Sequence, residues 1–115
     1  MSKKFDYQNI YDRWSKLVNM TYSEIRSFYL SKEGKTAGIG PGRKSARALM
    51  RMKLKNPNDW SENDWQWARR QISFISRMKK YRDTRGMKPK FEKNGIKTRW
   101  YKSLLIWGHD PKKRR

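Results

Sequence analysis

Hydrophobic side chains recur every three or four residues along much of the chain, which is the spacing of α-helices with one buried face. The longest such pattern covers residues 61–82. Its apolar positions form two rows, one of Trp65, Ala68, Ile72 and Ile75, and one of Trp67, Phe74, Met78 and Tyr81, with Gln71 between them. Apolar cover this wide predicts that the helix forms the centre of the core.

Local signals mark the start of this central helix. Ser61 is a favourable N-cap, and Glu62 and Asp64 place negative charge where the helix dipole favours it. Trp60 precedes the cap and can pack on Trp65, one turn into the helix, as a hydrophobic staple. We interpret the two carboxylates as complements to the dipole rather than as metal ligands.

Four shorter segments show the same periodicity. The first helix, capped by Asp6, is expected to bury the side of Tyr7, Ile10, Tyr11, Trp14, Leu17 and Val18. Thr21 and Glu24 have capping-box spacing and start a second helix, and a third covers residues 43–55 and stops before Pro57. Thr98 caps the last helix, which Gly108 ends. The predicted fold class is all-α, a small single domain of about five helices.

Two segments rich in glycine and proline interrupt the helices. Residues 83–97 are expected to form a loop with a small hairpin at Asn94-Gly95. The other segment, residues 34–42, is expected to be a loop. Its backbone amides and the start of the next helix could bind phosphate beside Arg43 and Lys44; the alternative is that the segment is only a flexible turn. It is not a nucleotide-binding P-loop, because Arg43 separates the last glycine from Lys44 and Ser45.

Charge narrows the choice of partner. The 115 residues include 30 Lys or Arg and 10 Asp or Glu, a formal net charge of +20. Such charge is typical of disordered chains, but 6 Trp, 6 Tyr and 4 Phe, many at helical spacing, predict a folded body. A compact body this positive repels itself unless an anionic partner offsets the charge. DNA or RNA, an anionic membrane and an acidic protein are the candidates.

The positive charge is unevenly distributed along the chain. Residues 1–33 are a near-neutral, aromatic helical segment, residues 34–110 form a basic body, and residues 111–115 are a basic tail expected to be mobile. Within the body, residues 57–68 carry Asp59, Glu62 and Asp64 and no base. We therefore place the anion-binding surface after residue 33.

The candidate phosphate-binding residues lie on two helices, the glycine-rich segment and the tail. They are Lys35, Arg43, Lys44, Arg47, Arg51, Lys55, Arg69, Arg70, Arg77, Lys80, Lys112, Lys113, Arg114 and Arg115. On the helices these cations lack acidic partners four residues away, so we expect compensation from outside the fold. The predicted function is nucleic-acid binding, mainly electrostatic, with DNA favoured. If about six to eight phosphates are neutralised, the log-log salt slope on duplex DNA is about −5 to −7.

Alternative functions remain open. Trp107 and Tyr101, near the tail, are the aromatic residues best placed to stack on unpaired bases. A second hypothesis is a small adaptor or inhibitor that docks on an acidic protein surface in a nucleic-acid machine through the aromatic helices of residues 6–31. A third is a basic structural protein of a ribonucleoprotein or packaged genome.

The sequence does not suggest an enzyme, a cofactor or a metal site. With no Cys and a single His, His109, a zinc site of ordinary composition is excluded, and His109 and Asp110 are expected to terminate the last helix. No apolar run spans a bilayer and no signal peptide is seen, so we expect a soluble cytoplasmic or nucleoid-associated protein with no membrane partner. The oligomeric state is left open.

Overall fold

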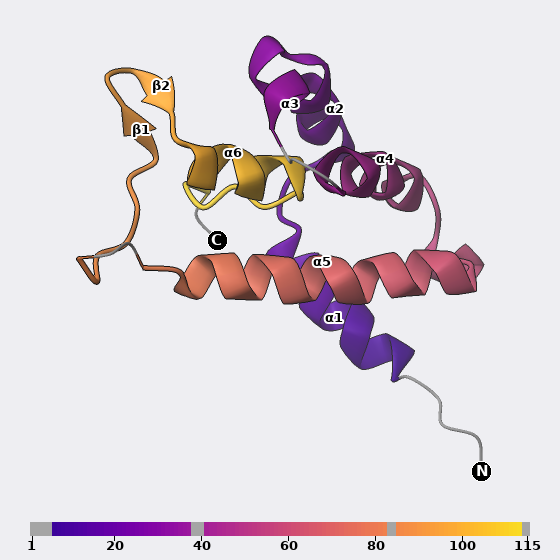
Figure 1. The fold of residues 1–115 in the computed structure, drawn as a ribbon. Coiled ribbons are helices and arrows are strands. Elements are labelled where there is room, and N and C mark those ends of the chain that lie inside the picture. The colour runs from indigo at the N-terminus through magenta and orange to yellow at the C-terminus, as the bar shows by residue number, and fades with distance from the viewer. Residues whose placement is uncertain (1–5, 38–40, 83–84, 114–115) are drawn as a thin grey trace.

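The computed structural model describes residues 6–37, 41–82 and 85–113, which are mostly helical (Figure 1). The α-helices are α1 (Tyr7–Leu17), α2 (Tyr22–Leu30), α3 (Lys32–Thr36), α4 (Gly42–Lys53), α5 (Glu62–Lys80) and α6 (Arg99–Ile106). A 3-10 turn, η1 (Pro57–Asp59), precedes α5, and strands β1 (Glu92–Lys93) and β2 (Ile96–Lys97) precede α6. The all-α fold class is confirmed, with one helix more than expected in the described part, the short α3.

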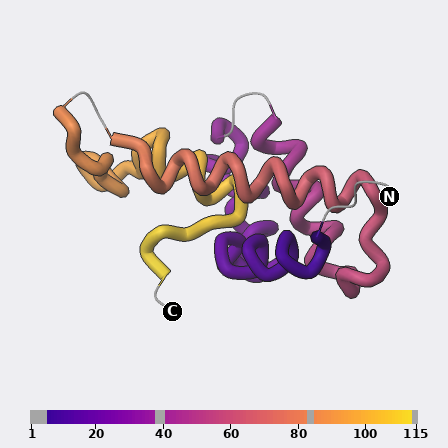
Figure 2. Tube along the Cα trace, turned by 90° about the horizontal axis from the view of Figure 1, so that it is seen from below, coloured from indigo at the N-terminus to yellow at the C-terminus, as the bar shows by residue number. Residues whose placement is uncertain are grey.

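The longest helix, α5, contacts α1, α4 and α6. Figure 1 shows α5 crossing the molecule, with α1 on one side and α4 and α6 on the other. Helix α2 contacts α3, α4 and α6, and so closes the core on the side away from α5. Figure 2 shows that the hairpin of β1 and β2 extends beyond one end of this bundle. The expectation that residues 61–82 supply the central core helix is confirmed, although the helix itself ends at Lys80.

The two apolar rows of α5 differ in burial. The first row, Trp65, Ala68, Ile72 and Ile75, is fully buried, as predicted. The prediction for the second row is wrong: Trp67, Phe74 and Met78 are half-buried, and Tyr81 is 50% exposed. The neighbouring helices cover this side of α5 only in part: Trp67, Phe74 and Met78 pack against the edge of the core, and Phe74 also lines a cleft.

A buried polar side chain links three helices at the centre. The indole N–H of Trp14 in α1 donates to Gln71 Oε1 at 2.7 Å, and Gln71 Nε2 donates to Ser45 Oγ in α4 at 3.1 Å. Gln71 and Ser45 are both 0% exposed. These bonds satisfy groups that would otherwise be costly to bury and fix how α1, α4 and α5 meet.

The predicted helix starts are confirmed. Asp6 caps α1, and the capping box of Thr21 and Glu24 starts α2. Ser61 caps α5, and the staple of Trp60 on Trp65 forms with ring centroids 4.7 Å apart. Thr98 caps α6.

Gly108 ends α6, as expected, by adopting a left-handed backbone (φ +91°). The N–H of Gly108 donates to the carbonyl of Leu105, and the N–H of His109 donates to that of Leu104, which together form a Schellman motif. His109 is buried, with Nδ1 2.6 Å from the carbonyl oxygen of Leu17, so this turn also joins the end of α6 to the end of α1.

The structure confirms the prediction for one of the two glycine-containing segments and corrects the prediction for the other. The hairpin at Asn94-Gly95 is confirmed: both residues have positive φ, at 56° and 78°, and β1 pairs antiparallel with β2. The predicted loop at residues 34–42 is wrong at its start, because Gly34 lies inside α3. A Cβ at Gly34 would lie 1.7 Å from the carbonyl oxygen of Phe28, so glycine lets α3 pack directly on the end of α2. Gly38 and Gly40 lie outside the described residues.

Candidate functional site

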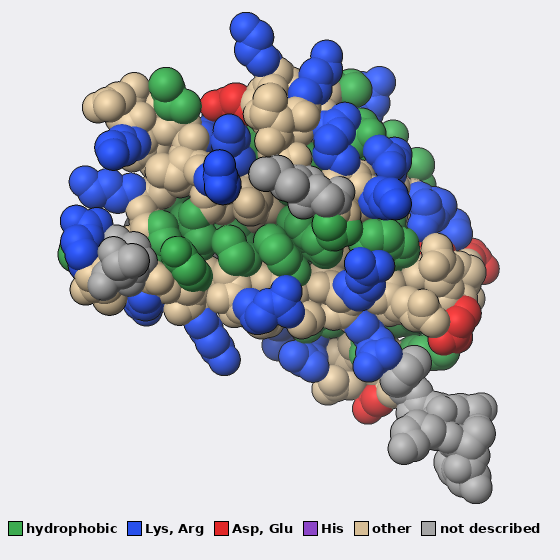
Figure 3. Space-filling view, in the orientation of Figure 1, with side chains coloured by type: hydrophobic (Ala, Val, Ile, Leu, Met, Phe, Trp, Pro, Cys, Tyr) green, Lys and Arg blue, Asp and Glu red, His purple; other side chains and the backbone are tan. Residues whose placement is uncertain are grey.

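A cleft of about 1000 Å³ lies between α5 and α6 and is bordered by the end of α3 and the start of α4. In the space-filling view, a stripe of hydrophobic side chains follows α5 on this face, and Lys and Arg side chains lie on both sides of it (Figure 3). The Asp and Glu side chains visible there lie at the margins of the molecule. The cleft therefore combines an apolar base with positively charged walls.

Two stacked aromatic rings form the floor of the cleft. The centroids of Phe74 in α5 and Trp107 after α6 are 4.3 Å apart, and their planes differ by 17°. Phe74 is half-buried, and Trp107 is 5% exposed. Pro41 and Ala37 extend the apolar lining toward α4 and α3.

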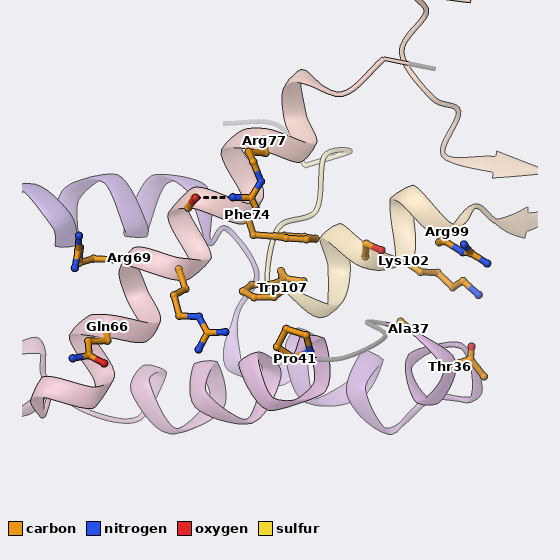
Figure 4. Close-up of a pocket in the computed structure, with 13 residues that line it drawn as sticks. Thr36, Ala37, Pro41, Gln66, Arg69, Phe74, Arg77, Arg99, Lys102 and Trp107 are labelled. Carbon is orange, nitrogen blue, oxygen red and sulfur yellow. Dashed lines mark hydrogen bonds between the residues drawn. The ribbon is translucent and has the colours of Figure 1, made fainter. Parts of the chain in front are cut away.

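Five cations line the walls, and their positions follow from helical spacing. Arg69, Arg70 and Arg77 come from α5, and Arg99 and Lys102 from α6. Residues three, four or seven apart share one side of a helix, so Arg70 and Arg77 flank Phe74. Figure 4 shows Arg77 beside Phe74, Arg99 and Lys102 projecting from α6, and Arg69 at the outer margin.

Neutral groups orient two of these cations. The guanidinium of Arg70 lies 4.5 Å from the centroid of the Trp67 ring. Arg77 donates to Ser73 Oγ at 2.9 Å and lies 6.0 Å from the Phe74 ring centroid. Within the described part of the chain, no Asp or Glu lines the cleft. An aromatic ring or a hydroxyl holds an arginine without cancelling its charge, so the cleft stays strongly positive.

The neutral hydrogen-bond donors of the cleft lie on its walls. The indole N–H groups of Trp14, Trp60 and Trp100 each donate to a protein oxygen. The indole Nε1 of Trp107 lies 3.5 Å from where a Cβ at Gly42 would stand, beside the start of α4. Ser73 and Ser103 add hydroxyls to the walls. A bound anion or carbonyl group would therefore meet both charged and neutral donors.

The predicted phosphate pocket at Arg43 is not supported by the described geometry. Arg43 Nη1 donates to the carbonyl oxygens of Tyr29 (3.2 Å) and Gly34 (2.8 Å), and its guanidinium lies 3.9 Å from the Tyr29 ring centroid. A Cβ at Gly42 would approach Ile106 to 3.3 Å, so this glycine serves the packing of α4 on α6. Arg43 thus ties α4 to α2 and α3.

Two further predicted residues, Arg51 and Lys55, pair with an acid that the helix pattern did not reveal. Asp64 accepts from Arg51 Nη2 at 3.1 Å and from Lys55 Nζ at 2.9 Å, and its carboxylate is 1% exposed. Burial acts to raise the pKa of Asp64, but the hydrogen bonds from Lys55, Ser61 and Arg51 outweigh it and lower the pKa. The expectation that these cations need a partner outside the fold is therefore wrong.

The tail residues are also engaged within the fold. Lys112 pairs with Glu92 at 3.3 Å and Lys113 with Glu24 at 2.6 Å. The bond from Lys113 lowers the pKa of Glu24. Arg114 and Arg115 lie outside the described residues.

The remaining predicted cations lie outside the cleft lining. Lys35, Lys44, Arg47 and Lys80 are exposed on α3, α4 and α5. Arg47 donates to the Tyr29 hydroxyl at 2.8 Å, a bond that lowers the pKa of Tyr29. Of the predicted site residues, the structure thus brings Arg69, Arg70 and Arg77 together in one cavity.

Sequence reasoning missed Arg99 and Lys102. Both lie on α6, three residues apart, which places them on one side of that helix. This spacing is visible in the sequence, but only the packing of α6 beside α5 brings them opposite Arg70 and Arg77.

The expected exposure of two aromatic residues is wrong. Trp107 is 5% exposed and Tyr101 is 4% exposed. Burial, with Asp110 nearby, raises the pKa of Tyr101 to about 12. In residues 6–31, Ile10, Trp14 and Ile25 are likewise buried in the core, which removes them from a docking surface.

The described residues contain no group of three or more His, Asp or Glu side chains arranged to hold a metal ion. No helix within them combines the length and apolar character needed to cross a membrane.

Comparison with known proteins matches the chain to a protein family. A family model described as "Protein of unknown function (DUF3140)" matches residues 13–105. This range includes α5, α6 up to Leu105 and every residue of the cleft except Trp107. No curated protein and no solved structure matches the chain.

Proposed function

The chain belongs to the DUF3140 family of proteins of unknown function, and from its cleft we propose that it is a non-enzymatic protein that binds the phosphate backbone of nucleic acid. The observation that carries the proposal is the group of five cations along a cleft whose described lining includes no acid. Like charges held this close repel one another, and an anion with several charges relieves the repulsion.

The spread of the charges favours a polymer over a single phosphate. The lining of α5 runs from Gln66 to Arg77, about 16 Å at 1.5 Å per residue. Arg99 and Lys102 supply a second row on the facing wall. Phosphates repeat at regular short intervals along a nucleic-acid strand, so one strand can contact several of these cations together.

The same features argue against the other anionic partners. A flat lipid surface contacts protruding side chains and not the inside of a cleft. An acidic protein segment is the remaining candidate, and we treat it as an outcome of the test. With this partner we propose a cytoplasmic or nucleoid-associated location.

A salt-dependent binding titration tests the proposal. Fluorescence anisotropy of labelled DNA and RNA oligonucleotides is measured over a range of salt concentrations. If the five cleft cations each neutralise one phosphate, the log-log slope is about −3 to −5. The double variant R70Q/R77Q is expected to lower affinity at least tenfold and to reduce the magnitude of the slope by about two.

The matched control removes the same charge elsewhere. Arg13 in α1 and Arg26 in α2 are exposed and do not line the cleft, so R13Q/R26Q is expected to change affinity less than threefold. Equal losses in the two double variants would mean that net charge, and not the cleft, determines binding. A slope near zero, or binding only to an acidic protein after nuclease treatment, would refute the proposal.

A further inference from the structure

The cleft combines two kinds of surface that a single ligand has to match. Its walls carry Arg70, Arg77, Arg99 and Lys102, and its floor is the stacked pair of Phe74 and Trp107. Cations are matched by phosphates. The half-buried ring of Phe74 is matched by flat apolar faces, because burying such faces against it removes apolar area from water.

Duplex nucleic acid offers only one of these surfaces. In a duplex the base faces are stacked on one another, and a protein meets phosphates, sugars and the base edges in the grooves. A duplex lying across the walls would leave the aromatic floor uncovered. An unpaired strand offers phosphates and free base faces together, which is why aromatic side chains in basic grooves are typical of single-strand binding.

The arrangement of the floor between the charged walls fits such a strand. Phe74 lies four residues after Arg70 and three before Arg77, so cations precede and follow the ring along α5. Figure 4 shows Phe74 and Trp107 side by side, with Arg77 on one side and Lys102 on the other. A base on the floor would have its own phosphates within reach of both walls.

We propose that the cleft is a single-strand site, in which unpaired bases pack on the half-buried ring of Phe74, supported by Trp107, and the backbone phosphates meet Arg70, Arg77, Arg99 and Lys102. This proposal rests on the proposed function, because it names which form of nucleic acid the cleft binds. Any base has an apolar face, so the site selects unpaired strands without reading their sequence.

Three polymers of equal length test this in the wild-type protein at one salt concentration. They are a mixed-sequence single strand, its duplex and an abasic strand, which keeps the phosphates and lacks the bases. The single strand is expected to bind tighter than the duplex and at least tenfold tighter than the abasic strand, which corresponds to one stacked base. Quenching of tryptophan fluorescence should accompany binding of the single strand and not of the abasic strand.

Variants locate the contribution of the bases. F74L keeps an apolar side chain and every charge but removes the ring, and is expected to weaken single-strand binding about tenfold with less than a twofold effect on the duplex. The control F28L replaces a half-buried phenylalanine of α2 that does not line the cleft, and it should change the affinity for neither the single strand nor the duplex. Thermal melting checks that both variants fold.

The outcomes separate the two proposals. If the abasic strand or the duplex binds as well as the single strand, the single-strand site is refuted while salt-dependent nucleic-acid binding stands. If none of the three polymers binds with a salt-dependent affinity, the proposed function itself fails. If F74L weakens all three polymers equally, the ring supports the walls and does not stack on bases, and the inference is wrong.

Discussion

Removal of the Asp64 carboxylate should destabilise the fold more than any other loss of a single acid. Asp64 is the buried acid of α5, and it accepts hydrogen bonds from the Ser61 backbone N–H, from Arg51 and from Lys55. The substitution D64A removes these acceptors and leaves the start of α5 without half of its capping box. It also frees two cations of α4 and the segment that follows it.

The magnitude follows from the separate contributions. Loss of the cap interaction costs about 1 kcal/mol. The charged hydrogen bonds add about 1 to 2 kcal/mol, a value reduced because the side chains of Arg51 and Lys55 are 45% and 33% exposed and can return to water. The sum is about 2 to 3 kcal/mol, or a fall in Tm of about 8 to 12 °C for a domain of this size.

The pH dependence distinguishes the charge from the packing. The pKa of Asp64 is lowered in the folded protein, so its carboxylate stabilises the fold fully at any pH above 3.8, the ordinary pKa of aspartate in an unfolded chain. This stabilisation is lost as pH falls through the lower pKa of the folded state. The stability difference between wild type and D64N should therefore be constant near neutral pH and shrink in this acidic range.

Urea denaturation followed by circular dichroism measures these changes at pH 7 and at intervals toward pH 3. The control D59A removes an exposed carboxylate of η1 and is expected to change stability by less than about 0.5 kcal/mol. The reasoning is refuted if D64A costs no more than D59A, or if the difference between wild type and D64N persists unchanged through the acidic range.

Three further predictions concern other buried positions. Q71L leaves the Trp14 indole N–H without its acceptor and should lower the free energy of unfolding, measured by urea denaturation, by about 1 to 3 kcal/mol. An unchanged free energy would mean that water replaces the lost hydrogen bond. G108A places a Cβ within 2.8 Å of a buried leucine at φ +91° and should lower the free energy of unfolding by about 2 to 4 kcal/mol. The control G95A, where a Cβ meets open space, should cost about 1 kcal/mol. Similar losses in the two variants would refute the packing argument. Burial lowers the pKa of His109, so the unfolded chain takes up a proton first, and stability should fall as pH drops below 6.5. Thermal melting of wild type and H109Q between pH 5 and 8 checks this, and identical profiles would exclude His109 as the cause.

Features that depend on neighbours in the chain were predictable. The caps at Asp6, Thr21, Ser61 and Thr98, the hairpin turn at Asn94-Gly95 and the helix stop at Gly108 all form. Each involves residues within about four positions of one another, so the local sequence suffices to specify it. The fully buried row of α5 was predictable for a similar reason, since periodicity marks the side of a helix that must leave water.

The partners of charged side chains were not predictable in this way. Asp64 was interpreted as a complement to the helix dipole, whereas it also binds Arg51 and Lys55, 13 and 9 positions away. Arg43 was expected to face phosphate, whereas it binds the carbonyl oxygens of Tyr29 and Gly34. Long cationic side chains reach across helices, so their contacts depend on which helices lie side by side.

The amino-acid sequence by itself thus determined where α1, α2, α5 and α6 begin, where α6 ends, which row of α5 is fully buried, and that the protein carries a large excess of positive charge. Only the tertiary structure decided which cations the fold neutralises and which it gathers around Phe74 and Trp107. The physical reason is range: capping and periodicity act over one or two turns of a helix, whereas a cleft exists only once α5 and α6, nearly twenty residues apart in the chain, pack against each other.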